Sequence, residues 1–149
     1  ITMDCDGTHN PIYINRMIKL LSSQKIDLVS TNRFLQKNSL DDWSLWRKKL
    51  TTLRHHVIKL LLNIKFDSSG AFRCYNTKKI KLQDILNAKN ESYSFFWESI
   101  FILSKKYKIR EIPIKLPGRL SGSSKMRLKD IFSAVIYLFK IFFKKRLFI

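Results

Sequence analysis

The sequence predicts an α/β domain, because stretches with the 3.6-residue period of a helix alternate with short apolar stretches typical of buried strands. Length and composition agree with this class. The chain has 149 residues, of which 45% are hydrophobic, which suits one domain or the larger part of one. Neither internal repeats nor a low-complexity linker divides the sequence.

The chain is strongly basic. It has 29 Lys and Arg residues against 11 Asp and Glu residues, which gives a net charge of +18. Such a charge predicts attraction to a polyanion: nucleic acid, an anionic membrane surface or a phosphorylated substrate. Charge does not choose among the three. The two cysteines, Cys5 and Cys74, lie far apart without metal-type spacing, which fits a reducing compartment.

The first element is the end of a strand that leads into two carboxylates. Residues 1–3 are an apolar run, and Gly7 and Pro11 mark the loop after it. Asp4 and Asp6 therefore lie at the carboxyl end of the predicted strand. In open α/β sheets this edge is where ligands bind.

The other elements follow from hydrophobic periodicity and from loop residues. Helices are predicted over residues 11–24, 43–64 and 92–107, strands over 25–34 and 109–116, a loop over 35–42, a turn-rich stretch over 66–75 and a basic loop over 117–126. The longest helix carries apolar residues at three- or four-residue spacing: Trp46, Leu50, Leu53, Val57, Leu60 and Leu61. This pattern predicts an amphipathic helix, and we expect its aromatic residues to face the core.

The C-terminal segment, residues 128–149, mixes aromatic and aliphatic residues with Lys and Arg. Its apolar stretches fall short of the ~20 residues needed to span a bilayer. Two interpretations stay open: a helix at the interface of an anionic membrane, or a helix packed on this domain or a neighbour. We assign residues 1–130 to the domain and residues 131–149 to a basic-aromatic, membrane-interfacial segment.

The acidic pair suggests a metal site. Two carboxylates one residue apart on a turning loop can both face a hard divalent cation whose other ligands are substrate phosphates, although such pairs also form ordinary turns and caps. Basic residues recur at element ends: Arg33, Arg47, Arg73, Arg119 and Lys125. Arginine binds phosphate through two parallel hydrogen bonds, and the alternative for each residue is a solvated surface charge. Together they favour a substrate such as a nucleotide-sugar diphosphate.

Six segments in order resemble the motifs of polyprenyl-phosphate (dolichol-phosphate) mannosyltransferases, within the family 2 glycosyltransferases: TMDCDGTHNP, DLVSTNRF, WSLWRKKLTTL, DSSGAFRCY, SYSFFWE and REIPIKLPGRLSGSSKM. The resemblance implies a partial glycosyltransferase-A fold, a Rossmann-like mixed sheet with flanking helices, followed by C-terminal amphipathic helices. In such enzymes the aspartate pair lies mid-domain. We therefore expect the C-terminal part of a catalytic domain, without the nucleotide-binding N-terminal half and inactive by itself.

The resemblance also implies a donor site. Asp4 and Asp6 would bind Mg²⁺ or Mn²⁺ on the donor diphosphate. Arg119 and Lys125, in the basic loop, would bind the donor phosphates. The donor implied is a nucleotide sugar, GDP-mannose, from which a hexose is transferred with inversion.

An acceptor site is implied in the same way. Arg33, Arg47 and Thr51 match the family residues that hold the phosphate of a polyprenyl or dolichyl phosphate. Arg47 and Thr51 are four residues apart and share a helix face. Asp6, Arg33 and Arg47 would carry catalysis. The expected location is the cytoplasmic face of a membrane, peripheral or anchored, with an anionic membrane surface as partner.

Three departures from the family pattern leave the sugar open, glucose included. Phe96 replaces an amide, Thr8 stands where the family often has Gln or Ser near the metal, and Ala71 replaces a glycine. Because a phosphate acceptor needs no base, we expect Glu98 to be a structural partner of a nearby arginine.

Two alternatives remain, a basic nucleic-acid-binding module and a non-catalytic, membrane-associated remnant. The first would stack bases on exposed aromatic residues: Phe34, Trp43, Trp46, Phe95, Phe96 and Trp97. The sequence holds no recognised nucleic-acid motif, so our prediction is that the partners do not include nucleic acid. His55 and His56 have no acidic or cysteine partner at ligand spacing, so we expect them to face core or solvent.

Overall fold

A three-stranded mixed sheet flanked by helices forms the structure, a computed structural model that describes residues 1–23, 25–118 and 128–147. The elements are α1 (Tyr13–Ser23), β1 (Leu28–Asn32), α2 (Leu45–Leu62), β2 (Arg73–Tyr75), α3 (Leu82–Leu86), α4 (Ser94–Ser104), β3 (Ile109–Pro113) and α5 (Leu128–Leu147). The predicted α/β class is confirmed. The arrangement is compatible with part of a Rossmann-like domain.

The sheet has the order β2-β1-β3, with β1 antiparallel to β2 and parallel to β3. The predicted N-terminal strand is reduced to one bridge, in which Thr2 pairs with Arg73. Each donates its backbone N–H to the other's carbonyl oxygen, at 2.9 and 3.0 Å. The loop with the two aspartates therefore begins beside β2, at the outer edge of the sheet.

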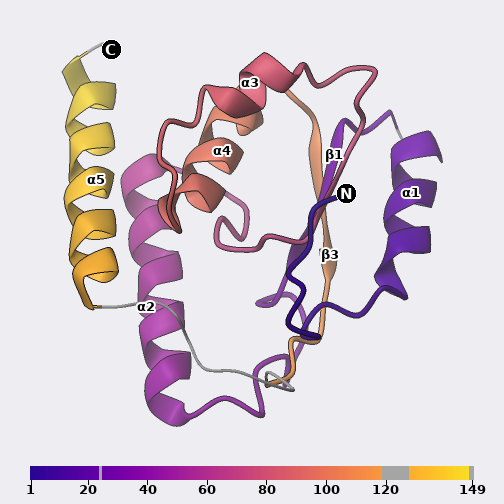
Figure 1. The fold of residues 1–149 in the computed structure, drawn as a ribbon, viewed down its shortest axis with the longest axis horizontal. Coiled ribbons are helices and arrows are strands. Elements are labelled where there is room, and N and C mark those ends of the chain that lie inside the picture. The colour runs from indigo at the N-terminus through magenta and orange to yellow at the C-terminus, as the bar shows by residue number, and fades with distance from the viewer. Residues whose placement is uncertain (24, 119–127, 148–149) are drawn as a thin grey trace.

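Helices cover both faces of the sheet (Figure 1). Successive residues of β1 point to opposite faces, so Leu28 joins one core cluster and Val29 the other. On one face Met17 of α1 packs with Val29. On the other face Leu28 belongs to the cluster that includes Ile58 of α2 and Trp97 of α4. Helix α5 adds to this second layer and lies beside α2 (Figure 1).

The other predicted helices and strands are confirmed, with small shifts at their ends. Two elements were missed: β2 lies inside the stretch expected to be turn-rich, and α3 is a five-residue helix. Both are short, and strand β2 exists because its three residues pair with β1. Such pairing leaves no periodic signal in so few residues.

Helix α2 is bounded by two caps. The Ser44 side chain accepts a hydrogen bond from the Arg47 backbone N–H at 3.3 Å, which satisfies a donor of the first turn. Asn63 ends the helix in the left-handed conformation, with φ of 54°, and donates its N–H to the Lys59 carbonyl. The first cap fixes the start of α2 and so the position of Arg47 in its first turn.

The apolar stripe of α2 points away from the core. Five of its six members are exposed, from 37% for Val57 to 82% for Leu60: Trp46, Leu50, Leu53, Val57 and Leu60. The sixth, Leu61, is partly buried and packs against the core cluster. The buried residues are His55, Ile58 and Leu62. Nine residues separate Trp46 from His55, which is half a turn out of phase. The expectation that the α2 aromatic residue faces the core is wrong, because periodicity defines an apolar face without defining what covers it.

Helix α5 has two apolar faces. Leu138 is buried in the core cluster, and Tyr137 and Ile141 pack against it. A second face is exposed and includes Phe132, Ile136, Phe139 and Phe143. Packing on this domain is thus confirmed for the inner face, and the outer face stays without a partner among the residues described. Within these residues, no helix is both long and apolar enough to cross a bilayer.

Candidate functional site

The loop of the two aspartates is a hydrogen-bonded turn. The Asp6 Oδ1 atom accepts the Thr8 backbone N–H at 3.2 Å and the Thr8 hydroxyl at 2.6 Å. Gly7 has a φ of 78°, a conformation that glycine adopts without strain. Asp4 is exposed and Asp6 partly buried. The turn therefore presents two carboxylates, one of them held by Thr8.

His9 holds this loop through a hydrogen bond. This role was not predicted from the sequence. The His9 Nδ1 accepts the Asp4 backbone N–H at 2.9 Å, and its ring lies 5.1 Å from that of Phe72. Burial lowers the pKa of His9; the Asp4 and Asp6 charges oppose this lowering, and Arg33 adds to it. The ring is thus a neutral acceptor. The signal available in the sequence was a histidine close after two aspartates.

Arg33 follows β1 and forms an ion pair with a buried carboxylate. Its Nε donates to Asp67 Oδ2 at 3.0 Å, and Asp67 is fully buried. Burial would raise the pKa of Asp67, but Arg33 and two hydrogen bonds from Ser69 outweigh burial and lower it. Thr2 and Ser30 both pair with Arg73 in an antiparallel sense, so the aspartates after Thr2 and Arg33 after β1 lie at the same end of the sheet. The charges of Arg33 and both loop aspartates act on His9, which agrees with this placement.

Glu111 of β3 holds Asp67 in place. Its Oε1 accepts the Asp67 backbone N–H at 2.6 Å, and its Oε2 accepts the Asn32 side-chain amide at 2.9 Å. Burial raises the pKa of Glu111 to about 7, with Asp67 adding to the rise and the two hydrogen bonds opposing it. The ends of β1 and β3 and the loop before β2 are therefore joined by one polar network.

Trp43 brings together the two arginines predicted to bind the acceptor, Arg33 and Arg47. The Arg47 Cζ lies 3.6 Å from the centroid of the indole ring, and the Arg33 Cζ lies 6.0 Å from it. Trp43 is itself buried, and its Nε1 donates to the Pro117 carbonyl at 3.5 Å. Thr51, one turn after Arg47, is partly buried on the same helix. The indole thus acts as a stacking platform for guanidinium groups.

Arg54 is a third arginine of this region that sequence reasoning missed. Desolvation of the guanidinium lowers the pKa of Arg54, the charge of Arg33 lowers it further, and the charge of Asp67 opposes the change. The side chain as a whole keeps exposed surface, and a guanidinium stays charged in proteins. Three guanidinium groups in one region are typical of a site that attracts anions.

The predicted donor residues, Arg119 and Lys125, lie outside the described residues. The chain after β3 is described as far as Pro117 and Gly118. Pro117 accepts the Trp43 hydrogen bond, and a side-chain carbon at Gly118 would lie 3.6 Å from Asp42. The loop therefore starts beside the arginine site.

Arg73 is not available to a phosphate. It is fully buried, and its guanidinium donates to the Ser99 hydroxyl at 2.8 Å and to the Phe96 carbonyl at 2.6 Å. The prediction that it belongs to the basic residues at ligand-binding edges is wrong. Its guanidinium instead donates hydrogen bonds that link the end of the sheet to α4.

Glu98 is structural, as expected, but its partners differ from the expected arginine. It is buried, and its two oxygens accept the Tyr137 hydroxyl at 2.7 Å and the Asn90 backbone N–H at 3.0 Å. His55 is buried against Phe34, with ring centroids 4.1 Å apart, and His56 is exposed. Both histidines behave as expected.

Base stacking finds little support in the structure. Trp43 and Trp97 are buried, and three of the six aromatic residues considered are partly buried: Phe34, Phe95 and Phe96. Trp46 alone of the six is exposed at 70%. Single-strand binding needs a row of aromatic faces open to successive bases, and these six residues do not provide one.

No protein-family model matches the chain, and the curated proteins that are similar to it include the following two. An undecaprenyl-phosphate mannosyltransferase of Micrococcus luteus is 25% identical over 138 residues, which cover 91% of this chain and 56% of that protein. An uncharacterized protein of Methanocaldococcus jannaschii is 28% identical over 149 residues, covering 97% of this chain and 59% of the relative. The chain thus spans less than two thirds of either relative. The chain is thus similar to part of a protein named as a mannosyltransferase.

Glu111 should make stability fall as pH rises through neutrality. Its folded-state pKa of about 7 exceeds its usual 4.5, so the folded state binds the proton more tightly. That contribution is complete below pH 4.5 and is lost as pH rises through 7. Urea unfolding should therefore show the wild type losing stability relative to Glu111→Gln between pH 5 and pH 8, by at most about 3 kcal/mol.

The histidines also make the free energy of unfolding depend on pH. Because they are the same in both proteins, their contribution cancels when the wild type is compared with the variant. The amide that replaces the Glu111 carboxylate has a single oxygen and can keep only one of the two accepted hydrogen bonds. The variant therefore differs in stability from the wild type at a given pH, and the difference in slope is the readout. Identical slopes for the two proteins would contradict a raised pKa at Glu111.

Proposed function

We propose that this chain belongs to a glycosyltransferase that moves a hexose from a nucleotide sugar to the phosphate of a polyprenyl or dolichyl phosphate. Mannose from GDP-mannose is the proposed donor. The observation that carries the proposal is the meeting of two aspartates, Arg33 and Arg47 at one edge of the sheet. The polyprenyl-phosphate acceptor named for the Micrococcus relative points the same way.

The arginine site suits the acceptor phosphate. Arg33 uses Nε for Asp67, and we propose that its outer guanidinium nitrogens bind the anion. Arg47 stacks on Trp43, which orients its planar group without using its donors. Thr51 adds a hydroxyl on the same face. Two fixed guanidinium groups hold a phosphate more precisely than flexible lysines would.

The aspartate turn suits a divalent cation bound to the donor. Asp4 and Asp6 offer carboxylate oxygens, the ligands that Mg²⁺ and Mn²⁺ prefer. No three His, Cys, Asp or Glu side chains gather as a metal cage in the part of the chain that the structure describes, so diphosphate and water would complete the coordination. The metal supplies charge neutralisation of the leaving nucleotide diphosphate.

The acceptor needs little activation. A phosphate monoester is already anionic and nucleophilic, so the reaction depends on alignment and charge balance more than on a general base. Arg33 and Arg47 would hold the attacking oxygen behind the sugar carbon, opposite the leaving diphosphate. Such in-line displacement inverts the configuration at that carbon. Arg119 and Lys125 would bind the donor phosphates.

We also propose that the protein works at the cytoplasmic face of a membrane. Support comes from the exposed apolar residues of α2 and α5, two helices that lie side by side (Figure 1). Helix α2 carries five Lys and Arg residues and no carboxylate. Apolar insertion and attraction to anionic lipid act together on such helices.

Asp6→Asn should abolish metal-dependent transfer. The test is transfer of radiolabelled mannose from GDP-mannose to a short polyprenyl phosphate by the full-length protein that carries this chain, with and without Mn²⁺. We expect turnover to fall by about 100-fold or more, since a fixed charge that balances the leaving group is lost. Glu91→Gln removes the same charge from an exposed loop position and should keep wild-type turnover.

Each result bears on one part of the proposal. Full Mn²⁺-dependent turnover by Asp6→Asn would refute the metal assignment. Failure of the wild type to load the lipid phosphate from either GDP-mannose or a glucose nucleotide would refute the function. Activity with the glucose nucleotide alone would change the sugar and keep the reaction class.

Replacing the α2 stripe should weaken membrane binding without unfolding the protein. In Leu53→Gln/Leu60→Gln, two exposed leucines lose their apolar character, so we expect about tenfold weaker binding to anionic vesicles and an almost unchanged melting temperature. The matched control is Leu35→Gln/Leu82→Gln, which alters two leucines exposed elsewhere. Equal losses in vesicle co-sedimentation for both doubles would argue against a membrane role for α2.

A further inference from the structure

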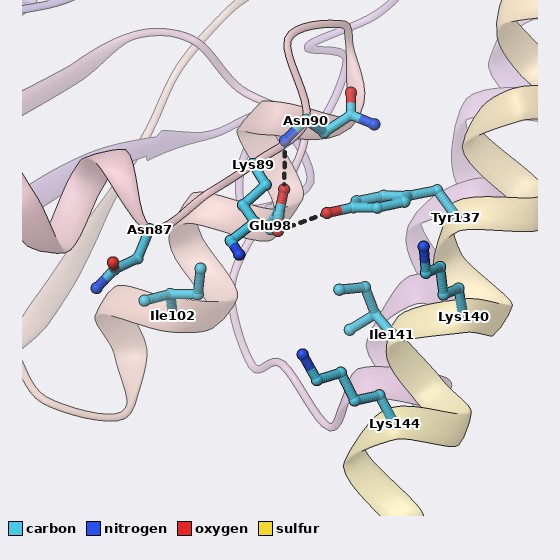
Figure 2. Close-up of a pocket in the computed structure, with 9 residues that line it drawn as sticks. All are labelled: Asn87, Lys89, Asn90, Glu98, Ile102, Tyr137, Lys140, Ile141 and Lys144. Atoms are coloured by element: carbon cyan, nitrogen blue, oxygen red, sulfur yellow. Dashed lines mark hydrogen bonds between the residues drawn. The ribbon is translucent and has the colours of Figure 1, made fainter.

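A second basic site lies apart from the sheet edge, between α4 and α5. It is a cavity of about 440 Å³ (Figure 2). The connection from α3 to α4 forms one wall and the C-terminal half of α5 forms the other. It shares no lining residue with the aspartate turn or the arginine site.

The floor of the cavity is a closed hydrogen-bond arrangement. Glu98 accepts from Asn90 and from Tyr137, so both of its oxygens are satisfied. Burial and Glu98 raise the pKa of Tyr137 to about 12, which keeps its hydroxyl protonated and donating. These contacts tie α5 to the α3–α4 connection, so the two walls are held together before any ligand binds.

Three lysines from the two walls line the cavity. Lys89 comes from the α3–α4 connection, and Lys140 and Lys144 come from successive turns of α5; Figure 2 shows all three around the cavity. All three are exposed, and no carboxylate of the described residues lies within ion-pair distance of any of them. Against them stands one carboxylate, Glu98, whose oxygens are engaged. The cavity therefore has an excess of positive charge.

The position of the α5 lysines connects the cavity to the proposed membrane face. At about 3.6 residues per turn, Lys140 and Lys144 occupy a strip of α5 between two apolar faces. On one flank Tyr137 and Ile141 pack inward. On the other flank Phe143 is exposed. When that exposed face lies among acyl chains, lysines at its border reach the level of the lipid headgroups.

We infer that this cavity binds the phosphate of an anionic lipid headgroup, with Lys89, Lys140 and Lys144 as its ligands. A phosphomonoester headgroup fits best, because its charge of up to two and its several oxygens match three ammonium groups. This inference rests on the membrane face in the proposed function. It adds a lipid site distinct from that of the acceptor phosphate.

The test compares two triple variants with the same change in net charge. Lys89→Gln/Lys140→Gln/Lys144→Gln removes the cavity lysines, and Lys19→Gln/Lys78→Gln/Lys115→Gln removes three exposed lysines elsewhere. Binding is measured by co-sedimentation with phosphatidylcholine vesicles that contain equal fractions of phosphatidic acid, a monoester, or phosphatidylglycerol, a diester. Binding of inorganic phosphate is followed by NMR of the same proteins.

We expect the wild type and the control triple to prefer phosphatidic acid, and the cavity triple to lose that preference with about tenfold weaker binding to those vesicles. Equal weakening of both triples would overturn the inference, since general electrostatics would then suffice. Saturation of the cavity lysines by inorganic phosphate, without preference for the lipid, would overturn the lipid assignment. None of these readouts depends on sugar transfer, so failure of the proposed reaction leaves the test intact.

Discussion

The buried ion pair between Arg33 and Asp67 is the contact on which the site depends. It joins the end of β1 to the loop before β2, and Glu111 of β3 anchors the same loop through the Asp67 backbone N–H. A fully buried carboxylate is tolerated only when it is paired, and breaking such a pair costs about 3–5 kcal/mol. The direction of the Arg33 side chain is therefore set by the fold, before any substrate is present.

The same contact lies in a region rich in arginine. Asp67 pairs with Arg33, and its charge also acts on Arg54. The Trp43 ring lies against Arg47 and near Arg33, and a cation over an indole face is attracted by the ring electrons. A concentration of guanidinium groups attracts anions, so the arrangement has a physical reason to bind phosphate. The aspartate turn, held by neutral His9, places carboxylates for a cation close by.

The local sequence pattern predicted most helices and strands. Contacts between distant parts of the chain decided which side chains are buried and which join the site. The period of α1 and α2 and the apolar runs of β1 and β3 were readable because each extends over several residues. The buried state of Arg73 was not readable, since its partners lie in α4, more than twenty residues away. Trp43 and His9 were missed as site residues for the same reason: their roles arise from neighbours that only the fold brings near.

The central claim is that the arginine site serves the acceptor and the aspartate turn serves the donor. Arg47→Gln in the full-length protein tests it most directly, with steady-state kinetics in polyprenyl phosphate and calorimetry of GDP binding on the same preparation. The account predicts an acceptor KM raised about tenfold or more, with the Kd for GDP unchanged. A collapse of GDP affinity with an unchanged acceptor KM would contradict it, because Arg47 would then bind the donor.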